Sequence, residues 1–264
     1  MRIFPELASG AAAQFPWRRT IGYRAVRNSF AAGEEIDYGD ASFEMRRWEL
    51  PLTDLEDLEW QAIRDLFEET GGRRLPFTFI EPGTNLLAWS DNLDEVIWVK
   101  SSGLSVNEGQ PDPVGGSAAT SLSAAGGWTV SQSIAAPASR AFAASAWLKC
   151  NASGSTLGLS DGAGQTKQLQ IDSDDAWRLY ELPWRQTSAA EQIIFEISGS
   201  GGATISAYGL QVEPQLGRSS YKRTKEQSGV FANAFFDQDS LEQSLTAPNQ
   251  SSGTVRIQWT PSPI

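Results

Sequence analysis

Apolar and polar residues alternate with two different periods along residues 47–87. Trp48, Leu50 and Leu52 are spaced by two, which is typical of a strand with one buried face. The next apolar residues recur at helical spacing, and Gly71-Gly72 follow them, which tolerate the left-handed turn that ends many helices. A period of two then returns. The pattern predicts strand, helix and strand, with the single helix packed beside a sheet.

The predicted helix has a defined start and an apolar stripe. Thr53 stands at the expected N-cap, and Glu56, three residues later, completes a capping box. The stripe comprises Leu55, Leu58, Ala62, Leu66 and Phe67. Trp60 falls off this stripe, which leaves it either at the edge of the stripe or in a subunit contact. Tryptophan and arginine are enriched in interface cores, so Trp60 is a candidate interface residue.

The chain divides into three segments by pattern. The first has strand-like runs at 19–30 and 43–52, with Gly33 and Tyr38-Gly39-Asp40 as predicted turns. The second is rich in Ser, Ala and Gly, and nine short strand-like runs predict a β-sandwich of jelly-roll type. These runs are 96–100, 118–122, 128–134, 141–149, 156–159, 167–171, 177–184, 192–197 and 204–212.

The third segment, 225–264, is too short for an independent domain. Val255, Ile257 and Trp259 alternate cleanly, but an isolated hairpin is marginal and needs a sheet to join. We therefore expect residues 1–85 and 225–264 to form one discontinuous domain, and 86–224 to be inserted into it. The expected fold class is mainly β: a β-sandwich or split barrel with one packed α-helix, plus an inserted jelly-roll β-sandwich.

Composition excludes several functions. The 264 residues include 21 basic and 32 acidic side chains, a formal charge of −11, which argues against nucleic-acid binding. The chain has no histidine, so a Ser-His-Asp triad and a His-ligated zinc are excluded. No run approaches the ~18 apolar residues of a membrane span, and the start lacks a secretory pattern. We predict no enzyme activity, no cofactor and no membrane insertion.

A few residues remain as candidates for binding. Asp172, Asp174 and Asp175 have the oxygen chemistry that calcium prefers, but we expect a solvated turn there rather than a metal site. Exposed aromatic rings suit sugar binding, because such rings are apolar on their faces and polar at one edge. The candidate glycan contacts are Trp128, Trp177 and Trp184, each with a core position as the alternative. Trp147 is predicted to lie in the core.

The order of motifs resembles that of distal tail and minor tail proteins of long-tailed bacteriophages. A separate stretch near the end of the second segment, Gly209 to Pro214 followed by Tyr221-Lys222-Arg223-Thr224, is similar to the ending of carbohydrate-binding-like modules in phage tail proteins. "FAASAWLK" followed by "DDAWRLYELPW" resembles galactose-binding-like modules. The residues that carry the tail-protein resemblance are Tyr38-Gly39-Asp40, Arg47-Trp48, Leu50, Leu52, Glu56, Phe67, Gly72-Arg73, Pro76-Phe77, Phe79, Pro82 and Asn85-Leu86-Leu87.

The resemblance implies a structural virion protein at the tail tip, assembled in the host cytoplasm. Its expected partners are further copies of itself in a hexameric ring, the tail tube protein and the tail tip or hub proteins. Arg46, Arg73 and Arg74 are then candidate interface residues, and the inserted domain is a candidate for host-surface glycans. Two alternatives remain: a soluble carbohydrate-binding or carbohydrate-cleaving protein, and a tail spacer with an inert insert.

Overall fold

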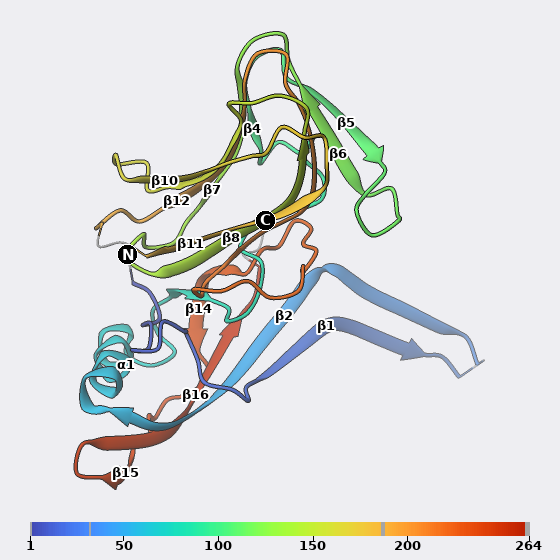
Figure 1. The fold of residues 1–264 in the computed structure, drawn as a ribbon. Helices are drawn as coiled ribbons and strands as arrows, with labels where there is room; N and C mark the ends of the chain where they lie inside the picture. Colours follow the sequence, from blue (N-terminus) through green and yellow to red (C-terminus); the bar gives the residue numbers. More distant parts are fainter. Residues whose placement is uncertain (1, 32, 186–187, 262–264) are drawn as a thin grey trace. The chain divides into compact units, whose positions relative to one another are not determined.

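The chain folds into two compact units, each built mainly of antiparallel strands. The computed structural model describes residues 2–31, 33–185 and 188–261 (Figure 1). The first unit comprises Met1–Ala8, Ala12–Phe79 and Phe231–Ile264; the second comprises Ser9–Ala11 and Ile80–Val230. The predicted fold class, a mainly β protein with one packed helix and an inserted β-sandwich, is confirmed.

One six-stranded sheet organises the first unit. Its strands follow the order β1-β2-β16-β14-β3, and β15 pairs with β16 beside this path. The strands are β1 (Arg18–Ser29), β2 (Glu35–Glu56), β3 (Phe77–Ile80), β14 (Val230–Phe236), β15 (Ser244–Ala247) and β16 (Gln250–Trp259).

The two ends of the chain meet in this sheet. β16 runs antiparallel to β2, with Val255 opposite Leu50 and Ile257 opposite Trp48. These four side chains are buried, because alternate residues of both strands point to one face. The Trp48 ring lies 4.7 Å from the ring of Phe231, centroid to centroid. The core therefore depends on residues from both ends of the sequence.

Helix α1 (Asp57–Thr70) packs on the sheet with a different face from the one predicted. The buried helix residues are Trp60, Ile63, Leu66 and Thr70. Leu58 is 78% exposed, so the predicted stripe is wrong at this position. The reason is a later start: β2 continues through Glu56, whose N–H donates to the Glu59 carboxylate at 2.9 Å. The capping box thus lies at 56 and 59, and Trp60, Ile63 and Leu66 pack in the core of this unit.

The second unit is a sandwich of two five-stranded antiparallel sheets. One sheet has the order β10-β9-β12-β7-β4 and the other β11-β8-β13-β6-β5. The strands are β4 (Val99–Lys100), β5 (Ser105–Gln110), β6 (Ala119–Ser123), β7 (Trp128–Ile134), β8 (Ala141–Cys150), β9 (Thr156–Ser160), β10 (Thr166–Gln170), β11 (Arg178–Arg185), β12 (Ile193–Gly199) and β13 (Thr204–Glu213).

Two predictions about local structure are wrong. Tyr38-Gly39-Asp40 do not form a turn; they belong to β2 and pair with residues of β1, as Gly39 does with Ala25. β5 was not expected, because its sequence SVNEGQ has one apolar residue and its side chains are mostly exposed. Such an edge strand lacks the apolar alternation by which strands are recognised.

Candidate assembly and binding surfaces

The long hairpin of β1 and β2 extends beyond the sheet that holds its base. Residues 46–56 of β2 pair with β16, whereas the part of β2 from Glu35 to Asp40 pairs with β1 alone. We call residues 24–40 the ribbon; Figure 1 shows it projecting from the sheet of the first unit. An isolated two-stranded ribbon is marginally stable in water. The ribbon therefore has the properties of an element that is completed by a partner.

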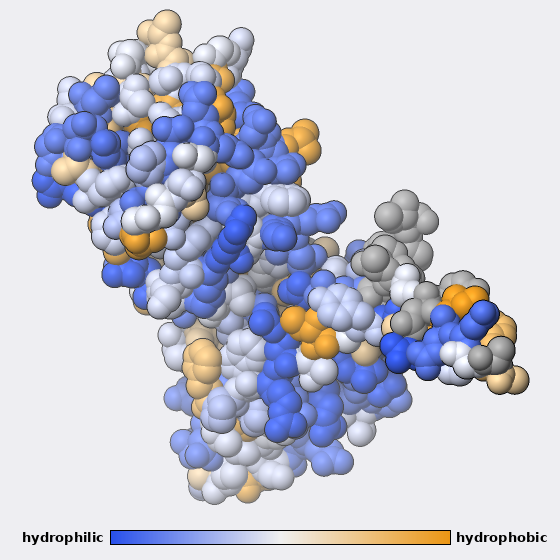
Figure 2. All heavy atoms as spheres, turned by 90° about the vertical axis from the view of Figure 1, so that its right-hand side faces the viewer, coloured by the Kyte–Doolittle hydropathy of each residue, from blue (hydrophilic) through white to orange (hydrophobic). Residues whose placement is uncertain are grey.

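Apolar side chains on the ribbon and at its base are exposed. Val26 is 47% exposed and Ile36 42%, and both lie on one face, since Val26 pairs with residue 38 and Ile36 with Asn28. Phe30 at the tip and Tyr23 at the base are also exposed. Figure 2 shows hydrophobic and hydrophilic residues mixed on this projecting part. The ribbon thus carries apolar surface that its own chain does not cover.

The outer edge of β1 is unpaired and basic. No other strand among the described residues pairs with this edge, although it contains twelve residues. Its sequence RRTIGYRAVRNS has four arginines and no acidic residue. Helix α1 carries the opposite charge, with Asp57, Glu59, Asp65, Glu68 and Glu69 against one arginine. Figure 1 shows α1 and the ribbon at opposite ends of the first unit, so the two charged surfaces do not neutralise each other.

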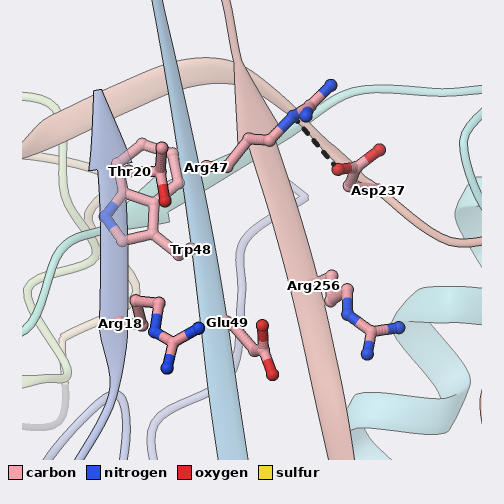
Figure 3. A pocket seen from close by; sticks show the side chains of 7 residues that line it. All are labelled: Arg18, Thr20, Arg47, Trp48, Glu49, Asp237 and Arg256. Carbon is pink, nitrogen blue, oxygen red and sulfur yellow. Dashed lines mark ion pairs between the residues drawn. The ribbon is translucent and has the colours of Figure 1, made fainter. Parts of the chain in front are cut away.

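A shallow hollow lies on the outer face of the first unit's sheet (Figure 3). Its central row crosses four adjacent chain segments, with Arg18 opposite Glu49, Glu49 opposite Arg256, and the N–H of Asp237 bonded to the Arg256 carbonyl. Charge therefore alternates along the row. Arg47 extends it by an ion pair with Asp237, 3.3 Å between nitrogen and oxygen. Among the residues that line the hollow, no nucleophilic side chain is paired with a general base. A charged protein surface therefore suits the hollow better than a small substrate does.

The candidate interface residues lie in different places. Trp60 is 2% exposed and packs in the core of its own subunit. Arg46 is half-buried, stacks 5.0 Å from the Phe231 ring centroid and pairs with Glu44. Arg73 pairs with Asp237 and Asp239 on the surface, and Arg74 is exposed. Trp60 is thus covered within the subunit, whereas Arg73 and Arg74 remain accessible.

The sequence strings at the two ends of the second unit meet in one polar cluster, in which Asn85, Gln211 and Glu213 are buried. We call Asn85, Gln211, Glu213, Lys222 and Thr224 the clasp. The Asn85 amide donates to the carbonyls of residues 210 and 222 at 2.9 and 3.1 Å, and its oxygen accepts the N–H groups of residues 87 and 212. The Thr224 hydroxyl donates to the carbonyl of residue 87 at 2.6 Å.

Glu213 completes the clasp with a fully buried carboxylate. It accepts hydrogen bonds from Gln211 at 2.7 Å and from the ammonium of Lys222 at 3.0 Å. The backbone N–H and hydroxyl of Ser219 donate to it as well. A buried charge is tolerated when it is paired and hydrogen-bonded in this way. The residues that carry the sequence resemblance at this end therefore close the fold of the second unit.

The candidate glycan contacts separate into core and surface. Trp128 is 3% exposed and its indole N–H donates to the carbonyl of Ala203, and Trp184 is 7% exposed. Buried rings of this kind offer no face to a ligand in solution. Trp177 is half-buried at the surface. Trp147 was predicted in the core and is instead half-buried on the outer face of β8, because its neighbours 146 and 148 occupy the inner positions.

The three candidate calcium ligands, Asp172, Asp174 and Asp175, form ion pairs with cationic side chains of the protein. Arg178 pairs with Asp174 and, at 3.3 Å, with Asp172, while Lys149 pairs with Asp175 at 3.4 Å. The hydrogen bond from Arg178 lowers the pKa of Asp174. Within residues 2–31, 33–185 and 188–261, no three His, Cys, Asp or Glu side chains are grouped so as to hold a metal ion. The described part of the chain also contains no helix with the length and apolar character to cross a membrane.

No protein-family model matches the chain, and no curated protein sequence does. Solved structures resemble it over about half its length. The enzymatically active domain of tailspike protein 4 from bacteriophage CBA120 is 15% identical with a TM-score of 0.41; the match covers 51% of this chain and 22% of the tailspike chain. The CBM22-1 xylan-binding domain from Paenibacillus barcinonensis is 16% identical with a TM-score of 0.38, covering 53% and 99%. TmCBM61, solved with β-1,4-galactotriose, is 16% identical with a TM-score of 0.37, covering 48% and 97%.

Proposed function

We propose that this chain is a structural protein of a bacteriophage tail that assembles with copies of itself into a ring at the distal end. The ring, six-membered by resemblance, joins the tail tube to the tip complex, and the second unit contacts host-surface glycans at the periphery. The observation that carries the proposal is the ribbon: a two-stranded extension with exposed apolar side chains and an unpaired edge. The order of sequence motifs supplies the tail-protein assignment.

The charges of the first unit support a ring over a symmetric dimer. A cyclic ring needs two different complementary surfaces on each subunit, because each contact is head-to-tail. The β1 edge is basic and the exposed face of α1 is acidic. We propose that the ribbon of one subunit docks against α1 of the next. Opposite charges on two distant surfaces steer this contact and disfavour like-with-like pairing.

The first experiment measures assembly. The purified chain should form closed rings in negative-stain images and a matching mass by light scattering. The double variant Val26→Asp with Ile36→Asp should give monomers with an unchanged melting temperature, because both side chains are exposed in the subunit. Val96→Asp is the matched control, since Val96 is 95% exposed in the second unit. A wild-type chain that stays monomeric at high concentration, alone and with tail tube protein, would contradict the proposal.

A charge exchange tests the partner surface. Arg24→Glu on the ribbon and Asp65→Lys on α1 should each weaken assembly, and the double variant should recover it, because the exchanged charges attract again. Recovery would be followed as the ring fraction at low and high salt. Equal losses that simply add in the double variant would show that the ribbon docks elsewhere.

The second candidate function is a soluble carbohydrate-binding protein. The clasp supports it, because its polar groups bond one another within the second unit, as is expected of a module that folds without assembly. This candidate predicts monomers that bind glycan with full affinity. The light-scattering measurement above separates the two candidates directly.

A further inference from the structure

Three side chains form a registered row on the outer face of the second unit. β8 lies between β11 and β13, and Trp147 is paired with Leu179 on one side and Tyr208 on the other. Directly opposed residues of paired strands share a face and have neighbouring Cβ atoms. All three side chains are half-buried. Because neighbouring strands lie about 4.8 Å apart, the row spans about 10 Å of surface.

A third aromatic ring, Tyr221, extends the row beyond β13. The Tyr221 ring lies 5.7 Å from the Tyr208 ring, between centroids, at an interplanar angle of 58°. Gly209 lies between these rings at a bulge of β13, and its φ of +64° is a backbone conformation that L side chains rarely adopt. The Tyr221 hydroxyl is hydrogen-bonded to Ser90 at 2.8 Å, which fixes the ring. The row is therefore held in place by the fold.

A fourth aromatic ring, Trp177, lies beside the row. It precedes Arg178, which pairs with Leu148, so the same register extended by one residue sets Trp177 opposite Lys149. Trp177 and Leu179 are two residues apart and share the outer face. We call Trp147, Trp177, Leu179, Tyr208 and Tyr221 the platform.

The indole N–H groups of the platform have no hydrogen-bond partner among the residues that the structure describes. This holds for Trp147 and Trp177, whereas Trp98 and Trp128 each donate to a backbone carbonyl. A half-buried ring with a polar edge left open suits a ligand that has both apolar and hydrogen-bonding surface. Sugars present C–H groups on their ring faces and hydroxyls around them.

The charged side chains around the platform indicate which ligand charge it can accept. Lys149 and Arg178 are both engaged, with Asp175 and with Asp172 and Asp174. Arg223, next to Tyr221, is likewise paired with Asp91. Among the described residues, each of these three cations is therefore engaged by a carboxylate of the protein, and none is left unpaired to bind a carboxylate or phosphate of a ligand. A neutral ligand is therefore favoured over an acidic one.

We propose that the platform is a binding site for a neutral oligosaccharide, with Trp147 and Trp177 as the stacking surfaces. This rests on the proposed glycan contact of the second unit and assigns it a place and a ligand class. The site differs from two of the tryptophans expected from the sequence, because Trp128 and Trp184 lie inside the sandwich.

The experiment is a glycan array probed with the full chain, using immobilised neutral oligosaccharides of galactose, xylose and glucose beside sialylated and uronic-acid oligosaccharides. Hits are then titrated by isothermal calorimetry. Trp147→Ala and Trp177→Ala should each weaken binding about tenfold, because each removes one apolar ring face from the contact. Val114→Ala, at a 70% exposed position of the same unit, is the control and should bind as the wild type does.

Each outcome decides the proposal. Neutral glycans bound by the wild type and lost in both tryptophan variants support it. Unchanged binding in both variants, no glycan binding at all, or preference for acidic glycans overturns it. Melting curves verify that variants are folded; should Trp147→Ala unfold, Trp177→Ala and Trp147→Phe provide the same comparison. Negative-stain images of the same samples report ring formation independently, so a failed platform with intact rings leaves the assembly proposal standing.

Discussion

The two units of this chain differ in how they complete their strands. The second unit brings its first and last segments together in the clasp, where buried polar groups satisfy one another. The first unit closes its core with β16 and yet leaves the ribbon without a third strand. A module that satisfies its own hydrogen bonds can act as a monomer. A sheet with an uncovered edge and exposed apolar side chains offers a surface on which another chain can pair.

The largest expected effect comes from separating the units. The Glu81 N–H donates to the Gly229 carbonyl at 2.9 Å, so the entry and exit of the second unit are adjacent. We expect residues 80–230 alone to fold as a monomer, and residues 1–79 joined to 231–264 by a short Gly-Ser linker to form rings. Circular dichroism and light scattering test both. An unfolded 80–230 fragment would show that the clasp does not suffice.

Breaking the clasp should have the next largest effect. Asn85→Ala leaves two carbonyls and two N–H groups in the interior without their partner, which should lower the free energy of unfolding by about 4 kcal/mol. Urea denaturation of the full chain measures it. Asn107→Ala is the control, because Asn107 is exposed and makes one 3.3 Å hydrogen bond. A loss below that of the control variant would contradict the assigned role of the clasp.

Alkaline pH should destabilise the second unit through Tyr221. Burial raises the pKa of Tyr221 to about 12. The unfolded state then loses its tyrosine proton first, so stability is retained below about pH 10 and falls by about 3 kcal/mol as the pH rises to about 12. Urea denaturation midpoints measured from about pH 10 to about pH 12 give the dependence of stability on pH. Tyr221→Phe should flatten it, and an equal slope in that variant would assign the effect to other groups.

The smallest effect concerns the helix of the first unit. Glu59→Ala removes the carboxylate that accepts the N–H groups of Glu56 and Ala8, and should cost about 1 kcal/mol of stability. Thermal denaturation detects this change. Glu68→Ala, at an exposed position 4.0 Å from Arg64, should change stability by less than about 0.5 kcal/mol. Equal effects in the two variants would mean that the cap contributes nothing specific.

Sequence patterns predicted the elements better than their faces. Trp48 and Leu50 alternate as core residues should, and most strands of the sandwich follow runs of apolar residues. The helix start was missed because Thr53 and Glu56 match the capping-box pattern, whereas the helix begins after Glu56, which does not match it. Pairing of Leu55 and Glu56 with β16 keeps these residues in the strand.

The platform was only partly visible in the sequence. Trp147 lies in an apolar run of β8, which is paired with β11 on one side and β13 on the other. The outward position of the Trp147 side chain follows from the register with these strands rather than from composition. The ribbon was hidden for a related reason. Glycine and aspartate at 39 and 40 indicate a turn locally, whereas pairing with β1 keeps them extended.

The hydrogen bond between Glu81 and Gly229 has an evolutionary consequence. An insertion whose two attachment points are neighbours can be replaced by another of different length or shape without moving the strands that flank it. Recombination could therefore exchange the whole second unit as a cassette. The strand pairing of the first unit would then stay the same while the second unit changed.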